Sequence, residues 1–126
     1  MAKAEAPQKS MLRDQQRALH AYDAVSRVQQ AQQKDYQIAV NDLGANILRS
    51  GLCAAIASVQ RLGNRGDVLL GDVATAGVPG LEGATASNLA EKIRKLDADG
   101  YMMATRELLQ VATWLKRAVQ ATFEET

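Results

Sequence analysis

The sequence is poor in the residues that build several common classes of protein. It contains one cysteine in 126 residues, so no internal disulfide can form and the chain does not fit a small, disulfide-stapled secreted domain. Aromatic residues make up only 4% of the chain and there are two prolines. Alanine is frequent instead, and alanine favours helices over strands. The composition therefore predicts a helical protein.

Long hydrophobic runs are also missing. No stretch approaches the roughly 18–20 consecutive apolar residues that a membrane-spanning helix needs. Residues 1–10 (MAKAEAPQKS) have no hydrophobic centre of the kind found in a signal peptide. We expect these ten residues to be a disordered lead-in, residues 11–126 to form a single helical domain, and the protein to be cytoplasmic.

The residues that carry most enzyme chemistry are scarce as well. His20 is the single histidine, and the sequence brings together no set of about four ligands for a zinc site. Cys53 lies between apolar neighbours, so we expect it to fill a small space in the core rather than act as a nucleophile. The sequence predicts no metal, no cofactor and no catalytic activity.

Hydrophobic periodicity places helices along most of the chain. The first is expected from apolar residues spaced three and four apart, namely Met11, Leu12, Ala18, Leu19, Tyr22, Val25 and Val28. The glutamine-rich residues 29–33 either continue this helix or form a turn. Asp35 is the expected N-cap of the second helix, which Gly51 ends. A third helix ends at Gly63, and residues 75–86 are the clearest loop.

The last helix has the strongest pattern. Asp99 is its expected N-cap, and its apolar face comprises Tyr101, Ala104, Leu108, Val111, Leu115 and Ala118. A second row, here called the polar seam, comprises Arg106, Gln110, Thr113, Arg117 and Gln120. Together these elements predict an all-α fold, a compact bundle of five to six helices with a long first and a long last helix.

The near-zero net charge of +1 hides an asymmetry along the chain. Residues 1–66 hold nine Lys and Arg against five Asp and Glu, whereas residues 67–126 hold six against nine. A protein that coats nucleic acid with uniform positive charge is therefore excluded, but a local basic patch is not.

Two arginines of the polar seam are aligned along the last helix. Arg106 and Arg117 differ by roughly 20° around the helix axis and lie about 16 Å apart along it. Two guanidinium groups in this arrangement fit phosphates a few nucleotides apart, although a solvated helix face explains the same pattern. Trp114 beside the seam is either a half-buried core residue or an anchor for a partner.

Several segments resemble one family. Residues 101–109 (YMMATRELL), followed by residues 114–117 (WLKR), are similar to the C-terminal signature of the small helical subunit of type III-B (Cmr) CRISPR effector complexes. A second block begins at Tyr36 and continues to residues 47–52 (ILRSGL), and residues 21–25 give a weaker third match. The three blocks occur in the family's order and cover most of the chain.

The resemblance implies a non-catalytic subunit of an antiviral ribonucleoprotein. Family members stack as copies along the inner filament, beside the backbone subunits that hold the guide RNA. They help hold the duplex of guide and target RNA, and the backbone subunits cut the target. Base pairing then supplies the sequence specificity, and the protein contacts the RNA backbone.

The resemblance also nominates residues by position. Arg49, Arg106, Lys116 and Arg117 match basic motif positions and are the expected RNA-binding residues. Trp114 and Tyr101 are the expected protein-interface residues. The alternative is a helical protein–protein adaptor that makes no direct RNA contact, with the arginines as charges at the rim of its interface.

Overall fold

The computed structural model describes residues 12–123, so the lead-in expected over residues 1–10 lies outside the described residues. The elements, in chain order, are α2 (Arg13–Ser26), the short 3-10 helix η2 (Gln30–Gln32), α3 (Gln33–Ser50), α4 (Leu52–Gln60), α5 (Asn64–Ala74), α6 (Leu89–Arg94) and α7 (Ala98–Thr122). No strand occurs between residues 12 and 123. The all-α prediction is confirmed. Among the helices between residues 12 and 123, none combines the length and the hydrophobicity of a membrane-spanning segment.

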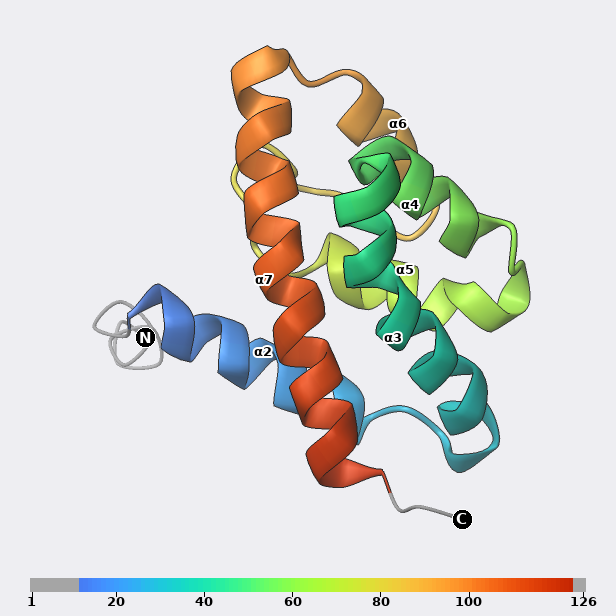
Figure 1. Cartoon of the computed structure of the whole chain (residues 1–126). Helices are drawn as coiled ribbons and strands as arrows, with labels where there is room; N and C mark the ends of the chain where they lie inside the picture. Colours follow the sequence, from blue (N-terminus) through green and yellow to red (C-terminus); the bar gives the residue numbers. More distant parts are fainter. Residues whose placement is uncertain (1–11, 124–126) are drawn as a thin grey trace.

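The longest helix, α7, is the axis around which the others are arranged (Figure 1). α2 crosses behind it, and α3 lies beside it and runs in the opposite direction. Gly44 of α3 is close to α7, since a Cβ added there would lie 3.8 Å from the Ala112 Cβ. Of the shorter helices, α4 and α5 pack on α3 and on each other, and α6 packs on α4.

A continuous apolar core joins all of these helices. The predicted apolar face of α7 is buried from Ala104 to Ala118, which confirms that periodicity. The loop over residues 75–86 also contributes to the core, because Val78 and Leu81 are buried. The loop is therefore a packed connection that closes one side of the bundle.

The first helix is oriented differently from the prediction. α2 has 14 residues and is shorter than α3, which has 18. Leu12, Leu19 and Tyr22 were expected inside but are exposed. Arg17 is buried instead, on the same face as Ala21, and it meets an opposite charge from α7. That ion pair, together with the small alanines of α2, determines the face that packs against α7.

Two predicted N-caps are displaced by two or three residues. The N-cap of α3 is Gln32, and Asp35 lies in the first turn of that helix. The N-cap of α7 is Asp97, whose Oδ1 accepts a hydrogen bond from the Gly100 backbone N–H at 2.8 Å. Aspartates near a helix start give the same sequence signal whether they cap the helix or follow the cap.

The junction between α3 and α4 follows the sequence prediction. Gly51 has a φ of +94°, a conformation that glycine adopts without steric cost. It ends α3 and begins α4 in a single residue. Cys53, in the first turn of α4, is exposed, so the prediction that it fills the core was wrong. The core face of α4 is formed by Leu52, Ala55 and Ile56, which turns Cys53 outward.

Candidate nucleic-acid interface

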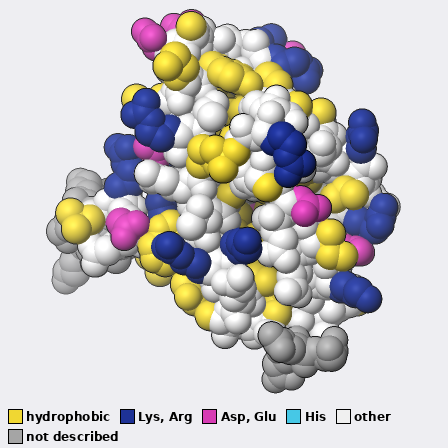
Figure 2. Space-filling view, in the orientation of Figure 1, with side chains coloured by type: hydrophobic (Ala, Val, Ile, Leu, Met, Phe, Trp, Pro, Cys, Tyr) yellow, Lys and Arg dark blue, Asp and Glu magenta, His cyan; other side chains and the backbone are white. Residues whose placement is uncertain are grey.

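The polar seam of α7 lies on the surface. All five of its residues are exposed, as predicted: Arg106, Gln110, Thr113, Arg117 and Gln120. Within residues 12–123, no carboxylate forms an ion pair with Arg106 or Arg117. On the face that carries α7, Lys and Arg side chains are more frequent than Asp and Glu side chains (Figure 2). The seam therefore presents unneutralised positive charge to solvent.

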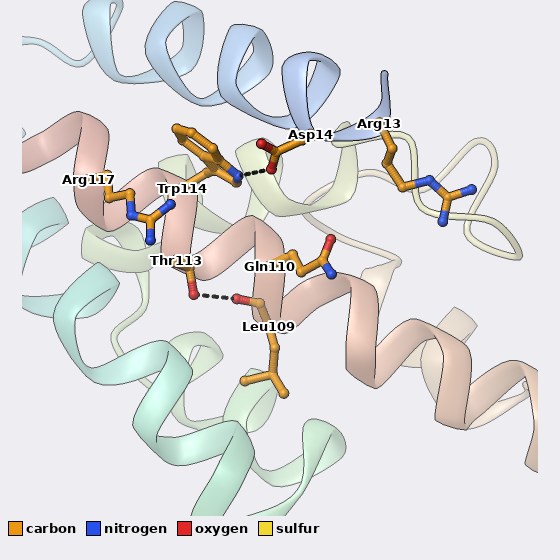
Figure 3. Close-up of a pocket in the computed structure, with 7 residues that line it drawn as sticks. All are labelled: Arg13, Asp14, Leu109, Gln110, Thr113, Trp114 and Arg117. Carbon is orange, nitrogen blue, oxygen red and sulfur yellow. Dashed lines mark hydrogen bonds between the residues drawn. The ribbon is translucent and has the colours of Figure 1, made fainter. Parts of the chain in front are cut away.

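A groove of about 500 Å³ lies between the start of α2 and the middle of α7. It is lined by Arg13, Asp14, Leu109, Gln110, Thr113, Trp114 and Arg117. The first two come from α2 and the others from α7 (Figure 3). Three members of the polar seam thus form one wall of a groove, and the opposite wall begins with an arginine from another helix.

Trp114 in the lining of this groove is held by two contacts. Its indole Nε1–H donates to Asp14 Oδ1 at 3.1 Å (Figure 3). The Arg117 guanidinium carbon lies 5.0 Å from the centre of the indole ring, within the range of a cation–π interaction. The ring is half-buried. Trp114 of α7 therefore links this helix to α2 through Asp14 and holds the Arg117 guanidinium against its ring.

A buried carboxylate connects the same two helices beneath the groove. Glu107 of α7 is buried, and its Oε1 lies 2.8 Å from Arg17 Nη2. Its Oε2 lies 2.8 Å from Arg13 Nη1. Arg17 also donates from Nη1 to the Ala76 carbonyl oxygen at 2.7 Å. Burial raises the pKa of Glu107, but the hydrogen bond from Arg17 and the charge of Arg13 outweigh it and hold that pKa below its ordinary value.

The remaining predicted site residues lie outside the groove. Lys116 is exposed on α7, and Arg49 is exposed in the last turn of α3. Tyr101 is half-buried near the start of α7, where its hydroxyl oxygen accepts the Cys53 backbone N–H at 3.0 Å. The structure thus brings Trp114 and Arg117 together and places Tyr101 at the α7–α4 junction.

Sequence reasoning missed the role of two groove-side residues. Arg13 was not among the expected RNA-binding residues, and Glu107 was assigned no role. A signal was present, because Glu107 follows Ala104 by three residues and precedes Val111 by four, which places it on the buried face. Arg17 precedes Ala21 by four residues on the inner face of α2.

A second polar cluster lies on the other side of α2. The buried Tyr36 hydroxyl donates to Asp72 Oδ2 at 2.7 Å, and His20 Nε2 lies 2.7 Å from the Asp72 carbonyl oxygen. Burial raises the pKa of Asp72, and the bond from Tyr36 only partly offsets this. Within residues 12–123, no three His, Cys, Asp or Glu side chains are arranged to hold a metal ion.

Comparison with known proteins relates the chain to a protein family and to a solved structure. A family model described as "CRISPR-associated protein (Cas_Cmr5)" matches residues 13–122, from the start of α2 to the end of α7. The X-ray crystal structure of a CRISPR-associated Cmr5 family protein from Thermus thermophilus superposes with a TM-score of 0.80 and 29% sequence identity. The match covers 90% of this chain and 100% of that one. Curated proteins searched by sequence give no match.

Proposed function

Because this chain belongs to the Cas_Cmr5 family, as a small subunit of the Cmr (type III-B) CRISPR complex, we propose that its α7 face helps hold the duplex of guide and target RNA. Arg106 and Arg117 are the first contacts with phosphate groups, and Lys116 and Arg49 are further ones. The observation that carries the proposal is the exposed polar seam, whose arginines have no carboxylate partner between residues 12 and 123.

The geometry supports contact with the RNA backbone. Guanidinium groups bind phosphate oxygens well because their planar donors match the spacing of those oxygens. Arg106 and Arg117 are about 16 Å apart along one helix face, so they reach separate phosphates of one strand. Backbone contacts carry no sequence information, which suits a complex in which the guide RNA selects the target by base pairing.

We further propose that the chain does no chemistry itself and that cleavage of the target belongs to the backbone subunits. The Cmr5 family is a family of small structural subunits, and antiviral defence then depends on this chain through assembly and RNA positioning. Copies of the chain stack along the inner filament beside the backbone subunits. Exposed large hydrophobic side chains support such protein contacts, among them Leu48, Met102 and Met103.

The test replaces both seam arginines in the assembled complex. Arg106→Ala with Arg117→Ala is expected to weaken target-RNA binding and to reduce the slope of log affinity against log salt by about 1.4–1.8, since each lost phosphate contact removes about 0.7–0.9. The matched control is Arg61→Ala with Arg65→Ala, two exposed arginines near the turn between α4 and α5. Equal salt slopes for both double variants would overturn the RNA-binding face.

The second candidate is the adaptor without RNA contact, which the exposed apolar residues named above favour. Photo-crosslinking within the assembled complex separates the two. Adducts between α7 and RNA support the first function. Adducts confined to neighbouring protein chains, with a crosslinker placed at Gln110 in the middle of the seam, support the adaptor.

A further inference from the structure

Arg13 differs from the other basic residues at the groove in how it is held. It is the first residue of α2, and its side chain is 59% exposed. Its Nη1 is tied to Glu107 Oε2 at 2.8 Å, and its side chain extends away from Asp14 and Trp114 at one end of the groove lining (Figure 3). A guanidinium has five N–H donors. One anchored nitrogen therefore leaves the others available for a ligand.

The charges around Glu107 leave a surplus at Arg13. Arg17 is buried and neutralises the single negative charge of Glu107 within the bundle. The second arginine on the same carboxylate gives the cluster a net charge of +1, and this charge resides on the exposed partner. The low pKa of Glu107 keeps the carboxylate ionised at neutral pH, so that the anchor persists.

The surplus charge lies at the same groove as three residues of the polar seam. Arg13 and Arg117 both line it, and Gln110 lies between them on the α7 wall. A side chain that is fixed before binding loses less conformational freedom when the ligand arrives. A phosphodiester strand lying in the groove would meet Arg13 on the α2 wall and Arg117 on the α7 wall, whereas contacts with Arg106 and Arg117 alone come from one helix.

We infer that Arg13 is an additional phosphate-binding residue and that Glu107 is its positioning residue, so that one RNA strand lies between Arg13 and the polar seam. This inference rests on the proposed RNA-binding function. The proposed RNA-binding site is then the groove between α2 and α7 rather than one face of α7 alone. Glu107 then has a role in binding besides its role in packing.

The test measures RNA affinity of the assembled complex at several salt concentrations. Arg13→Ala is expected to reduce the salt slope by about 0.7–0.9. Arg13→Lys keeps the charge and loses the planar anchor, so we expect an unchanged slope with affinity about two- to tenfold weaker. The matched control is Arg27→Ala, at the other end of α2, which removes an exposed arginine paired with Asp23 at 3.2 Å.

A double-mutant cycle tests the positioning role. In the Glu107→Gln background, Arg13→Ala is expected to weaken RNA binding less than it does in the unmodified chain, because the guanidinium is no longer held. A merely structural role for Glu107 would leave the effect of Arg13→Ala unchanged. If the Glu107→Gln chain does not enter the complex, the comparison of Arg13→Lys with Arg13→Ala decides the question.

The outcomes separate this inference from the proposed function. If Arg106→Ala with Arg117→Ala lowers the slope and Arg13→Ala behaves like Arg27→Ala, the contact of Arg13 with RNA is overturned and the proposed function stands. If none of these variants changes the slope, both fail. If Arg13→Ala weakens assembly of the complex but leaves the RNA salt slope unchanged, Arg13 binds an acidic protein surface, and the inference is again overturned.

Discussion

Arg17 and Glu107 form an ion pair inside the bundle, with Nη2 and Oε1 2.8 Å apart and both side chains almost fully buried. The pair joins the first helix to the last across 90 residues of sequence. A second bond, from Arg17 to the Ala76 carbonyl oxygen, extends the link to the loop after α5. Within residues 12–123 the Arg17 Nε has no hydrogen-bond partner, so the buried guanidinium is not fully hydrogen-bonded even with Glu107 present.

Removing Glu107 is expected to destabilise the protein strongly. Glu107→Ala leaves the buried Arg17 without its counter-charge, which costs about 3–5 kcal/mol of unfolding free energy. Urea denaturation followed by circular dichroism measures the loss. Arg17→Met together with Glu107→Leu removes both charges and is expected to recover most of it. A loss below about 1 kcal/mol for Glu107→Ala would contradict the buried pair, since it is less than breaking such a pair costs.

The start of α7 depends on Asp97. Asp97→Ala removes the side chain that accepts the Gly100 N–H, and we expect it to lower the unfolding free energy by about 1 kcal/mol. Asp99→Ala is the control, because Asp99 lies inside the first turn and contributes mainly through the helix dipole. The two variants are compared by thermal unfolding. A larger effect of Asp99→Ala would restore the sequence-based assignment of the cap.

Two glycines in helices, Gly44 and Gly66, are expected to respond oppositely to substitution by alanine. At Gly44 of α3 a Cβ would sit 3.8 Å from Ala112 Cβ, an ordinary contact, so Gly44→Ala is expected to stabilise by about 0.5–1 kcal/mol. At Gly66 of α5 a Cβ would collide with the Val59 carbonyl oxygen, so Gly66→Ala is expected to destabilise. The denaturant midpoints of both variants measure the two changes in stability. Changes of the same sign would contradict the packing described at these two glycines.

Asp72 gives a prediction about pH. Its pKa is raised in the folded state by burial, so its ionised form is disfavoured there. It contributes stability below its unfolded pKa of about 3.9, and this contribution is lost as pH rises through the folded pKa. Asp72→Asn retains an acceptor for the Tyr36 hydroxyl and removes the titration. We expect the variant to gain stability relative to the unmodified chain as pH rises toward neutral.

The measurement is the difference in unfolding free energy between variant and unmodified chain at a series of pH values. Asp42→Asn on the exposed face of α3 is the control, and its difference is expected to stay flat over the same range. A difference for Asp72→Asn that is flat, or that falls as pH rises, would contradict the assigned direction.

The helices themselves were predictable because their signal is local. Apolar residues three and four apart determine one face of α7, and that face is buried as the periodicity indicated. Gly51 ended α3 where the sequence placed the stop. Within the candidate site, the exposure of Arg106 and Arg117 followed from the same periodicity, since residues opposite a buried face are exposed.

The features that the sequence did not predict depend on contacts between residues that are distant in sequence. Arg17 is buried where Glu107 meets it from α7, and although the spacing to Ala21 places Arg17 on the inner face, nothing local to α2 identifies its partner. Leu19 and Tyr22 were therefore assigned to the wrong face. Cys53 was placed in the core because its neighbours are apolar, but α4 has only nine residues and buries one face. The groove has walls from two helices, so no single segment shows it.

The pairing of α2 with α7 also affects when the chain can fold during synthesis. A ribosome adds about 5–20 residues per second and releases the N-terminal end first. α2 therefore emerges long before the helix against which it packs, and Arg17 stays hydrated until Glu107 has been made. The apolar contacts among α3, α4 and α5 can form in the meantime. Of the helices in the described part of the chain, α2 is therefore made first, yet it cannot complete its packing until α7 has been made.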